Sequence, residues 1–180
     1  MNFHDLFQYC PRCGSPRFVS HNEKSKCCQD CHFVYYLNPS AATVAVIINE
    51  QDELLCVRRG KEPARGTLDL PGGFSDMGET SEEGVIREVR EETGLDVVST
   101  QFLFSLPNTY RYSDLDIPTM DMFYRCQVRT ADGLRAMDDA ADAQWIPLSQ
   151  VRPEDFGLTS IRKGVELLLR HSSLSLSPRD

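Results

Sequence analysis

Residues 72–95 read GGFSDMGETSEEGVIREVREETGL, and they hold six glutamates and one aspartate against two arginines. Thr80, with Glu83 three positions later, has the spacing of a helix-capping box. Gly94 stands where the C-terminus of a helix favours a left-handed residue. The stretch therefore predicts a helix over about residues 81–93.

The predicted helix sorts its side chains into two neighbouring arcs. At about 100° per residue, the first arc contains Val85, Ile86, Val89 and Thr93. The adjoining arc contains the carboxylates of Glu88, Glu91 and Glu92, with Gly84 beside them. Because the first arc faces the core, the glutamates lie along its edge, where unpaired carboxylates repel and resist ionisation. A divalent cation such as Mg²⁺ or Mn²⁺ would resolve the repulsion. The alternative is an acidic helix face that is simply solvated.

The spacing of the polar residues in this stretch matches a known motif. Gly73, then Glu79 after five residues, then REVREETGL (residues 87–95) after seven more fill every fixed position of G-x5-E-x7-R-E-U-x-E-E-x-G-U, where U is aliphatic. The chain therefore resembles the Nudix hydrolases over roughly residues 40–170. The resemblance implies an α/β class fold, an α/β/α sandwich around a mixed sheet. It also implies Mg²⁺-dependent hydrolysis of a diphosphate linked to a nucleoside.

The resemblance further implies roles for individual residues. Glu88, Glu91 and Glu92 would ligate the metal, and Glu88 or Glu92 would also orient or deprotonate a water molecule. Arg87 would brace the glutamates through a bidentate pair, with Glu79 holding Arg87 or contacting the cluster through water. Gly73 would offer its backbone carbonyl to the metal.

A further carboxylate often comes from the loop before the last strand in related proteins. This chain has Asp138, Asp139 and Asp142 there. Asp142 stands where related members have a glutamate, and we assign it as a metal ligand. A solvated loop acid is the alternative reading.

A separate metal site is predicted near the N-terminus. Cys10-x-x-Cys13 and Cys28-x-x-Cys31 form two chelating turns that supply four thiolates to a structural Zn²⁺, with Gly14 allowing the first turn. Disulfides are the alternative, Cys27 is an ambiguous neighbour of Cys28, and His21 and His32 are reserve ligands. Cys56 and Cys126 fall in alternating apolar runs and are expected to be buried thiols without chemistry. The predicted zinc ribbon, residues 1–36, resembles the ribbon that precedes the catalytic domain in NADH pyrophosphatases.

The charge of the ribbon argues against nucleic acid as a partner. Its basic and acidic residues nearly balance, so its aromatic side chains are expected to pack against the main domain or a second subunit. A homodimer is therefore expected. The whole chain carries a net charge of −8, which also disfavours a broad nucleic-acid surface.

The rest of the chain reads as one domain of strands and helices over residues 37–170. Strands are expected within residues 42–49, 53–59, 66–73, 97–106, 120–128 and 143–148, the first two forming a hairpin. Residues 158–170 have helical spacing, and residues 171–180 read as a disordered tail. No apolar run is long enough to span a membrane, and residues 1–5 lack the features of a signal peptide, so we expect a cytoplasmic protein.

Substrate choice depends on the region that follows the motif. NADH pyrophosphatases carry S-Q-P-W-P-F-P-x-S there, whereas residues 105–124 here lack the tryptophan and two of the prolines. Aromatic and basic side chains are candidates for contacts to a base and to phosphates: Tyr110, Tyr112, Arg58, Arg59, Lys61 and Arg65. We expect an ADP-ribose-like nucleoside diphosphate derivative as substrate. The alternatives are NADH, a similar dinucleotide or NAD-capped RNA, and, in another class, a Nudix-fold binding module without catalysis.

Overall fold

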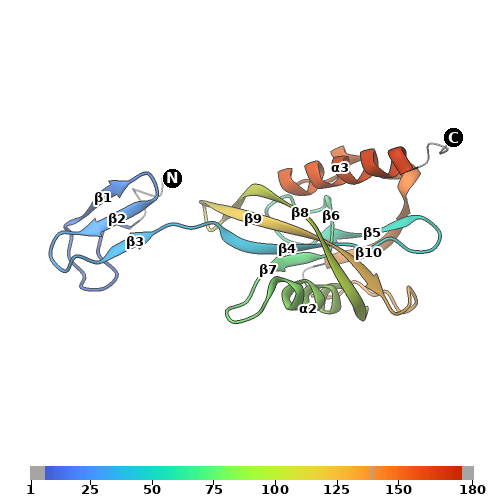
Figure 1. The fold of residues 1–180 in the computed structure, drawn as a ribbon, viewed down its shortest axis with the longest axis horizontal. Helices are drawn as coiled ribbons and strands as arrows, with labels where there is room; N and C mark the ends of the chain where they lie inside the picture. The colour runs from blue at the N-terminus through green and yellow to red at the C-terminus, as the bar shows by residue number, and fades with distance from the viewer. Residues whose placement is uncertain (1–6, 139, 176–180) are drawn as a thin grey trace.

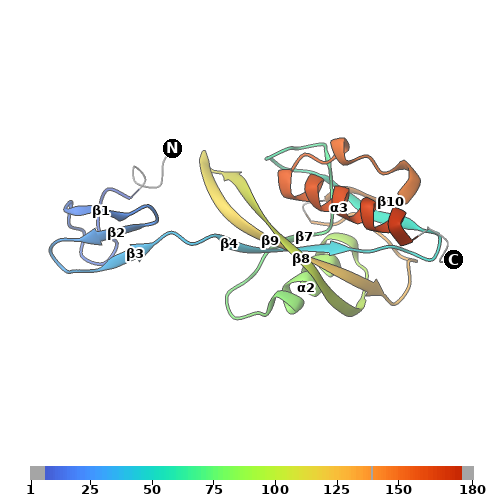
Figure 2. The same ribbon diagram turned by 45° about the horizontal axis from the view of Figure 1, so that its top comes forward.

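A computed structural model describes residues 7–138 and 140–175. The chain folds into a small N-terminal sheet and a larger body of two sheets and two helices (Figure 1). The small sheet contains β1 (Phe18–Asn22), β2 (Ser25–Cys28) and β3 (Val34–Tyr36), in that order. It lies to one side of the body in both Figure 1 and Figure 2, and an extended segment links it to β4.

The acidic stretch forms helix α2 (Ser81–Thr93), as the sequence predicts. Thr80 and Glu83 form the expected capping box, and Gly94 ends the helix in the left-handed conformation, with its N–H donating to the carbonyl of Arg90. Val85, Val89 and Thr93 are buried. Ile86 is an exception to the predicted apolar arc, because its position at the margin of the arc leaves it 38% exposed.

The strands of the body divide between two sheets. The larger sheet has the order β7-β4-β9-β8, and it is mixed because β4 and β9 are parallel while the other pairs are antiparallel. The smaller sheet has the order β10-β5-β6 and is antiparallel. The bounds are β4 (Ser40–Val46), β5 (Glu53–Arg59), β6 (Leu68–Asp69), β7 (Gly72–Phe74), β8 (Val97–Tyr112), β9 (Leu115–Val128) and β10 (Ala140–Pro147).

The two long helices cover opposite sides of the sheets, which gives the predicted α/β/α arrangement (Figure 1). Helix α3 (Thr159–Ser175) packs on one side and α2 on the other. Two short 3-10 helices, η1 (Leu148–Gln150) and η2 (Pro153–Asp155), connect β10 to α3. Helix α3 continues five residues beyond the predicted end at residue 170, and residues 176–180 of the expected tail lie outside the described residues.

The predicted hairpin of residues 42–59 forms only at its turn. The Asn49 side chain accepts hydrogen bonds from the N–H groups of Gln51 (3.0 Å) and Glu53 (2.9 Å), and a single bridge joins Ile48 to Leu54. Beyond the turn, β4 and β5 enter different sheets, where β4 pairs with β7 and β9 and β5 pairs with β6 and β10. The turn chemistry was predictable, but the pairing beyond it depends on distant strands.

Strand β4 separates two apolar cores, which explains its β-branched sequence. Val44 and Val46 pack toward α3 with Phe123, Phe156 and Val165. Ala45, and Ile47 just after the end of the strand, pack toward α2 with other residues of the second core, including Val85, Val89 and Tyr124. Strands buried on both faces lack the usual alternation of apolar and polar residues.

Cys56 and Cys126 are buried in these cores, as predicted. Burial raises the pKa of Cys56 and of Cys126 to about 12, so both side chains behave as small apolar groups. In the described part of the chain, no helix has the length and apolar character needed to cross a membrane.

Candidate active site

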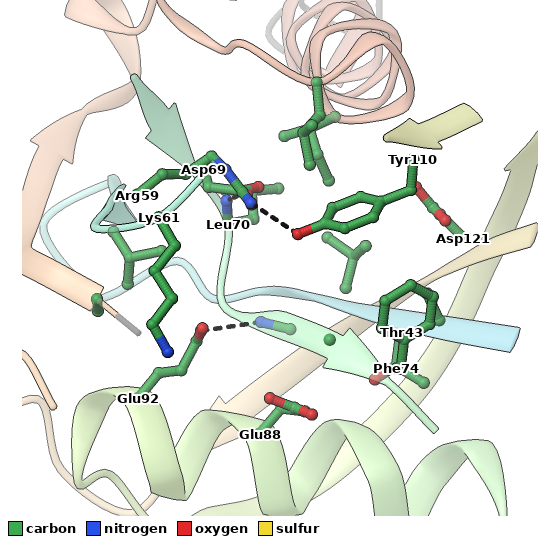
Figure 3. Close-up of a pocket in the computed structure, with 18 of the residues that line it drawn as sticks. Thr43, Arg59, Lys61, Asp69, Leu70, Phe74, Glu88, Glu92, Tyr110 and Asp121 are labelled. Carbon is green, nitrogen blue, oxygen red and sulfur yellow. Dashed lines mark hydrogen bonds and ion pairs between the residues drawn. The ribbon is translucent and has the colours of Figure 1, made fainter. Parts of the chain in front are cut away.

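Helix α2 presents its glutamates to the backbone of β7. A Cβ atom built on Gly73 would stand 2.6–2.8 Å from the carboxylate atoms of Glu88, so only glycine leaves room for this side chain. The N–H of Gly72 donates a hydrogen bond to Oε2 of Glu92 (3.1 Å; Figure 3). Two of the predicted metal ligands therefore lie directly against this short strand.

Arg87 is surrounded by carboxylates. Its Nε and Nη2 donate to the two oxygens of Glu79 (3.1 and 2.8 Å), and its Nη1 donates to Glu88 (2.8 Å) and Glu91 (3.0 Å). Nη2 also donates to the carbonyl of Phe74 (3.1 Å), which ties the helix to the end of β7. The hydrogen bond to Arg87 lowers the pKa of Glu79, and the same bond raises the pKa of Arg87. This arrangement fits the bracing role expected for Arg87.

Glu88 is much less exposed than Glu91 of the same helix. Its side chain is 14% exposed, against 48% for Glu91. Burial raises the pKa of Glu88, and the nearby charges of Glu91 and Glu79 act in the same direction, while Arg87 opposes them. The ionised form of Glu88 therefore needs more positive charge than Arg87 provides.

The three glutamates do not converge on one point in this structure. Glu91 turns toward Arg87, and Glu92 turns toward Gly72. Figure 3 shows the ammonium group of Lys61 pointing toward the Glu92 carboxylate. Among residues 7–138 and 140–175, the four N-terminal cysteines are the one group whose potential ligand atoms all lie within 4.8 Å of one another.

A cavity of about 660 Å³ runs from these glutamates past β7 to the side of the sheet that faces α3. This size falls in the range of small-molecule and cofactor sites. Its lining includes Arg58, Arg59, Lys61, Tyr110 and Tyr112, which were predicted to contact the substrate. Arg65 does not reach it.

Arg59 is held in place by several partners. It donates to the carbonyl of Pro63 (2.6 Å) and to the hydroxyl of Tyr110 (3.0 Å), and it forms an ion pair with Asp69 (Figure 3). Burial raises the pKa of Asp69, although the charge of Arg59 acts against this shift. Arg59 therefore supports the cavity wall around a buried carboxylate.

The two predicted base-stacking tyrosines lie in different settings. The ring of Tyr110 meets Phe74 edge to face, with ring centres 5.4 Å apart, so Tyr110 is part of a fixed wall. Tyr112 is 61% exposed near the end of β8. Arg58 donates to the carbonyl of Gly66 (2.7 Å) and is also near the surface.

The structure does not bring Asp142 to the cavity. Ala140 pairs with Arg59 and Asp142 pairs with Arg58, so a bulge between them turns Asp142 to the other face of β10. The Asp142 side chain accepts a hydrogen bond from the N–H of Ala143 (2.9 Å). Asp138, the other described member of this acidic loop, lines the cavity instead.

Several cavity residues were not identified from the sequence: Thr43, Asp69, Asn108, Thr119 and Asp121. They share no motif, and three of them lie on β8 and β9, where pairing brings them together. The sequence marks them only as polar residues at strand positions where an apolar residue would be expected. The stretch of residues 105–124, singled out for substrate choice, does contain these three.

The four cysteines of the N-terminal sheet lie close together. The Sγ atoms of Cys10 and Cys31 are 3.6 Å apart, as are those of Cys13 and Cys28. Disulfide sulfurs would be about 2.05 Å apart, whereas four sulfurs around a tetrahedral Zn²⁺ stand about 3.8 Å apart. A hydrogen bond from the N–H of Cys31 lowers the pKa of Cys28 to about 7. Cys27, His21 and His32 are outside this cluster.

Comparison with known proteins supports the resemblance that the motif indicates. A model of the NUDIX domain matches residues 38–166. The NAD-capped RNA hydrolase NudC of Vibrio atlanticus (strain LGP32) is 26% identical over 144 residues, which cover 80% of this chain and 51% of that protein. The ADP-ribose pyrophosphatase of Methanocaldococcus jannaschii is 36% identical over 118 residues, which cover 64% of this chain and 66% of that protein.

Similarity also extends to a solved structure. The crystal structure of a NUDIX hydrolase from Nitrosomonas europaea superposes with a TM-score of 0.71 at 19% identity and covers 93% of each chain. The alignments with the NudC relatives span only about half the length of those proteins.

Proposed function

This chain belongs to the NUDIX family, and from that membership we propose that it hydrolyses the diphosphate linkage of a nucleoside diphosphate derivative. An ADP-ribose-like compound is the favoured substrate. The observation that carries the proposal is the Glu88 carboxylate, only 14% exposed and packed against Gly73, which Arg87 braces at one end of a cavity of about 660 Å³. A carboxylate packed so close to the backbone and largely shielded from water is typical of a functional site and not of a solvated surface.

The residues around Glu88 fit a divalent cation. Glu88, Glu91, Glu92 and the backbone carbonyl of Gly73 offer oxygen atoms only, which Mg²⁺ and Mn²⁺ prefer. When bound, such a cation neutralises charge on the diphosphate and lowers the pKa of a water molecule. Burial raises the pKa of Glu88 although the ion pair with Arg87 opposes the shift, which fits a carboxylate that would accept a second cation.

The protein's own groups would then divide the work. Arg87 and Glu79 hold the glutamates in position, and Glu88 or Glu92 accepts the proton of the attacking water. The water oxygen bonds to one phosphorus while the bond from that phosphorus to the bridging oxygen breaks. Lys61 and Arg58 bring positive charge to the cavity and so favour an anionic substrate. ADP-ribose would yield AMP and ribose 5-phosphate.

A second substrate class has support of its own. Several relatives that align with about four-fifths of this chain are named as NAD-capped RNA hydrolases. NADH, a similar dinucleotide or NAD-capped RNA is therefore the alternative substrate. The relative named as an ADP-ribose pyrophosphatase is more identical, over a shorter span, and it supports the main proposal.

The proposal is tested with a panel of substrates and the purified protein in Mg²⁺. ADP-ribose, NADH, NAD-capped RNA, diadenosine polyphosphates and nucleoside triphosphates are compared by kcat/KM. We expect ADP-ribose to be preferred and Glu92→Gln to lower its kcat by orders of magnitude. A strong preference for NADH or capped RNA would support the alternative. No turnover of any member would favour a binding module without catalysis.

The zinc site, the domain boundary and the oligomeric state are further predictions. We expect a structural Zn²⁺ at Cys10, Cys13, Cys28 and Cys31, and a boundary between ribbon and catalytic domain near residue 37. A metal assay of protein prepared without chelator measures the first, and limited proteolysis the second. A cytoplasmic homodimer is also expected, and light scattering measures its mass.

A further inference from the structure

The cavity has a polar inner end on the side of the large sheet that faces α3. Asn108 on β8 pairs with Thr119 on β9, and Asp121 lies two residues further along β9 on the same face. Two apolar residues close this end of the cavity: Ile161 of α3, and Leu158, which directly precedes the helix. We call this region, lined by Asn108, Thr119, Asp121, Leu158 and Ile161, the inner pocket.

Asn108 has an unused hydrogen-bond donor in this pocket. Its Nδ2 atom is buried, and it has no hydrogen-bond partner among residues 7–138 and 140–175. A buried polar group without a partner lowers the stability of the folded protein, because the group has given up its hydrogen bonds to water. Such groups are uncommon, and a ligand that accepts this hydrogen bond would explain one here.

Asp121 supplies the complementary acceptor. It is 5% exposed, and it accepts hydrogen bonds from the hydroxyls of Thr119 (2.6 Å) and Ser160. A carboxylate has about four acceptor sites, so two remain. Within the described residues Asp121 forms no ion pair, in contrast to Asp69, which has Arg59. Figure 3 shows Asp121 beside Tyr110 at the far end of the cavity from the glutamates.

The spacing of the strands relates this pocket to the glutamates. β7, which covers Glu88, is separated from β9 by β4 alone, so about 10 Å lies between them at roughly 4.8 Å per strand. An extended nucleoside diphosphate spans such a distance. The edge-to-face pair of Phe74 and Tyr110 adds an apolar wall along the way.

We propose that the inner pocket binds the base of the substrate, and that Asn108 and Asp121 select a purine with an amino group at position 6, as in adenine. This inference deepens the proposed function and rests on it. Adenine offers an N–H to the carboxylate of Asp121 and a neighbouring ring nitrogen to Nδ2 of Asn108. A 6-oxo purine instead places the lone pairs of its oxygen against the carboxylate of Asp121. An ionised carboxylate has no donor to present to that oxygen, whereas an amide could rotate and offer its NH₂ group.

The test measures binding of mononucleotides by calorimetry, which requires no hydrolysis. Wild-type protein and the variants Asn108→Ala, Asp121→Asn and Thr109→Ala are titrated with AMP, IMP, GMP and UMP. Thr109 is the matched control, because it neighbours Asn108 on β8 but is exposed and points to the opposite face. Circular dichroism verifies that each variant folds.

We expect wild-type protein to bind AMP at least about tenfold more tightly than IMP, GMP or UMP. Asn108→Ala should weaken AMP binding by about tenfold, Asp121→Asn should reduce the ratio of AMP to IMP affinity, and Thr109→Ala should change neither. The inference is overturned if AMP and IMP bind equally, if AMP does not bind, or if Asn108→Ala leaves AMP binding unchanged. Asn108→Ala decides the outcome should Asp121→Asn fail to fold.

Failure of this inference can be separated from failure of the proposed function. ADP-ribose hydrolysis combined with AMP binding that is insensitive to Asn108 would reject the inner pocket and keep the function. AMP binding that depends on Asn108, without turnover of any substrate, would keep the pocket and reject the hydrolase.

Discussion

Glu88 occupies a position that favours its neutral form, and ionisation of this side chain therefore lowers the stability of the metal-free folded protein. Its folded pKa is raised, so the folded state holds the proton more tightly than the unfolded chain does. The stabilising contribution of the group is therefore complete below its unfolded pKa, near 4.3, and it is lost as pH rises through the folded pKa. At neutral pH the ionised side chain destabilises the metal-free fold. A site that depends on such a group trades stability for function.

The first prediction follows from the upward direction of the Glu88 pKa shift. Glu88→Gln should raise the Tm of the metal-free protein at pH 7 and leave it nearly unchanged at pH 4, while it lowers kcat by at least about 100-fold. Mg²⁺ should raise the Tm of wild-type protein more than that of the variant. Differential scanning calorimetry at both pH values provides the measurement. Glu91→Gln, at an exposed position, should raise the metal-free Tm less. Equal Tm values for wild type and Glu88→Gln at pH 7 would contradict the argument.

Two adjacent glycines allow a second test. A Cβ at Gly73 would meet the flexible end of the Glu88 side chain, whereas a Cβ at Gly72 would stand 2.1 Å from the backbone oxygen of Thr43. Gly72 also has φ of +154°, which side chains rarely adopt. Gly73→Ala should thus displace the carboxylate and reduce activity with little loss of stability. Gly72→Ala should lower the free energy of unfolding by several kcal/mol. Urea denaturation and kcat/KM separate the effects, and similar stability losses in both variants would oppose this reading.

At the level of elements, α2 depends on its cap as well as on its buried face. The Thr80 hydroxyl accepts from the Glu83 N–H (3.2 Å), and the Glu83 carboxylate accepts from the Thr80 N–H (2.8 Å). Thr80→Ala should lower the free energy of unfolding by about 1 kcal/mol, and Thr80→Ser should restore most of it. Urea denaturation measures both. If the serine variant were as unstable as the alanine variant, the hydroxyl would not be the stabilising group.

The helix could be predicted closely from its caps, but the strands could not. β8 continues through Pro107 to Tyr112, beyond the expected end at residue 106. Pro107 is tolerated because β8 is the edge strand of its sheet, so a missing N–H can face outward. Pro118 lies in β9 just before the residues that pair with β4. The position of a strand in its sheet decides whether a proline ends it, and this position cannot be predicted from the sequence of that segment alone.

At the level of the whole molecule, the candidate site combines a local part with a distributed part. The motif specifies the glutamates, Arg87 and Gly73, because all lie in one continuous segment formed by β7, the loop after it and α2. The inner pocket depends on pairing between β8 and β9 and on α3, which brings Asn108, Asp121 and Leu158 together. Asp142 illustrates the limit, since one bulge in β10 reverses the face on which a residue lies. Chemistry was therefore easier to predict than specificity.

The separation of the N-terminal sheet from the body leads to the last prediction. The sheet has a core of its own around Cys10, Phe18 and Cys28, and Figures 1 and 2 show it apart from the two larger sheets. So small a core is expected to need metal to fold. The single tryptophan, Trp145, packs against the core on the α2 side of the body, so its fluorescence reports on the body alone.

We expect two separate transitions on heating, with zinc release measured by a chromogenic chelator and unfolding of the body measured by Trp145 fluorescence. Cys10→Ser should reduce bound zinc and lower the temperature of zinc release, because three thiolates bind zinc more weakly than four. It should leave the fluorescence transition and the kcat unchanged. Cys56→Ser is the matched control: it alters a thiol buried in the body, so it should lower the fluorescence transition and leave zinc content intact. Coincident transitions in wild-type protein, shifted together by Cys10→Ser, would mean that the sheet and the body unfold as one unit.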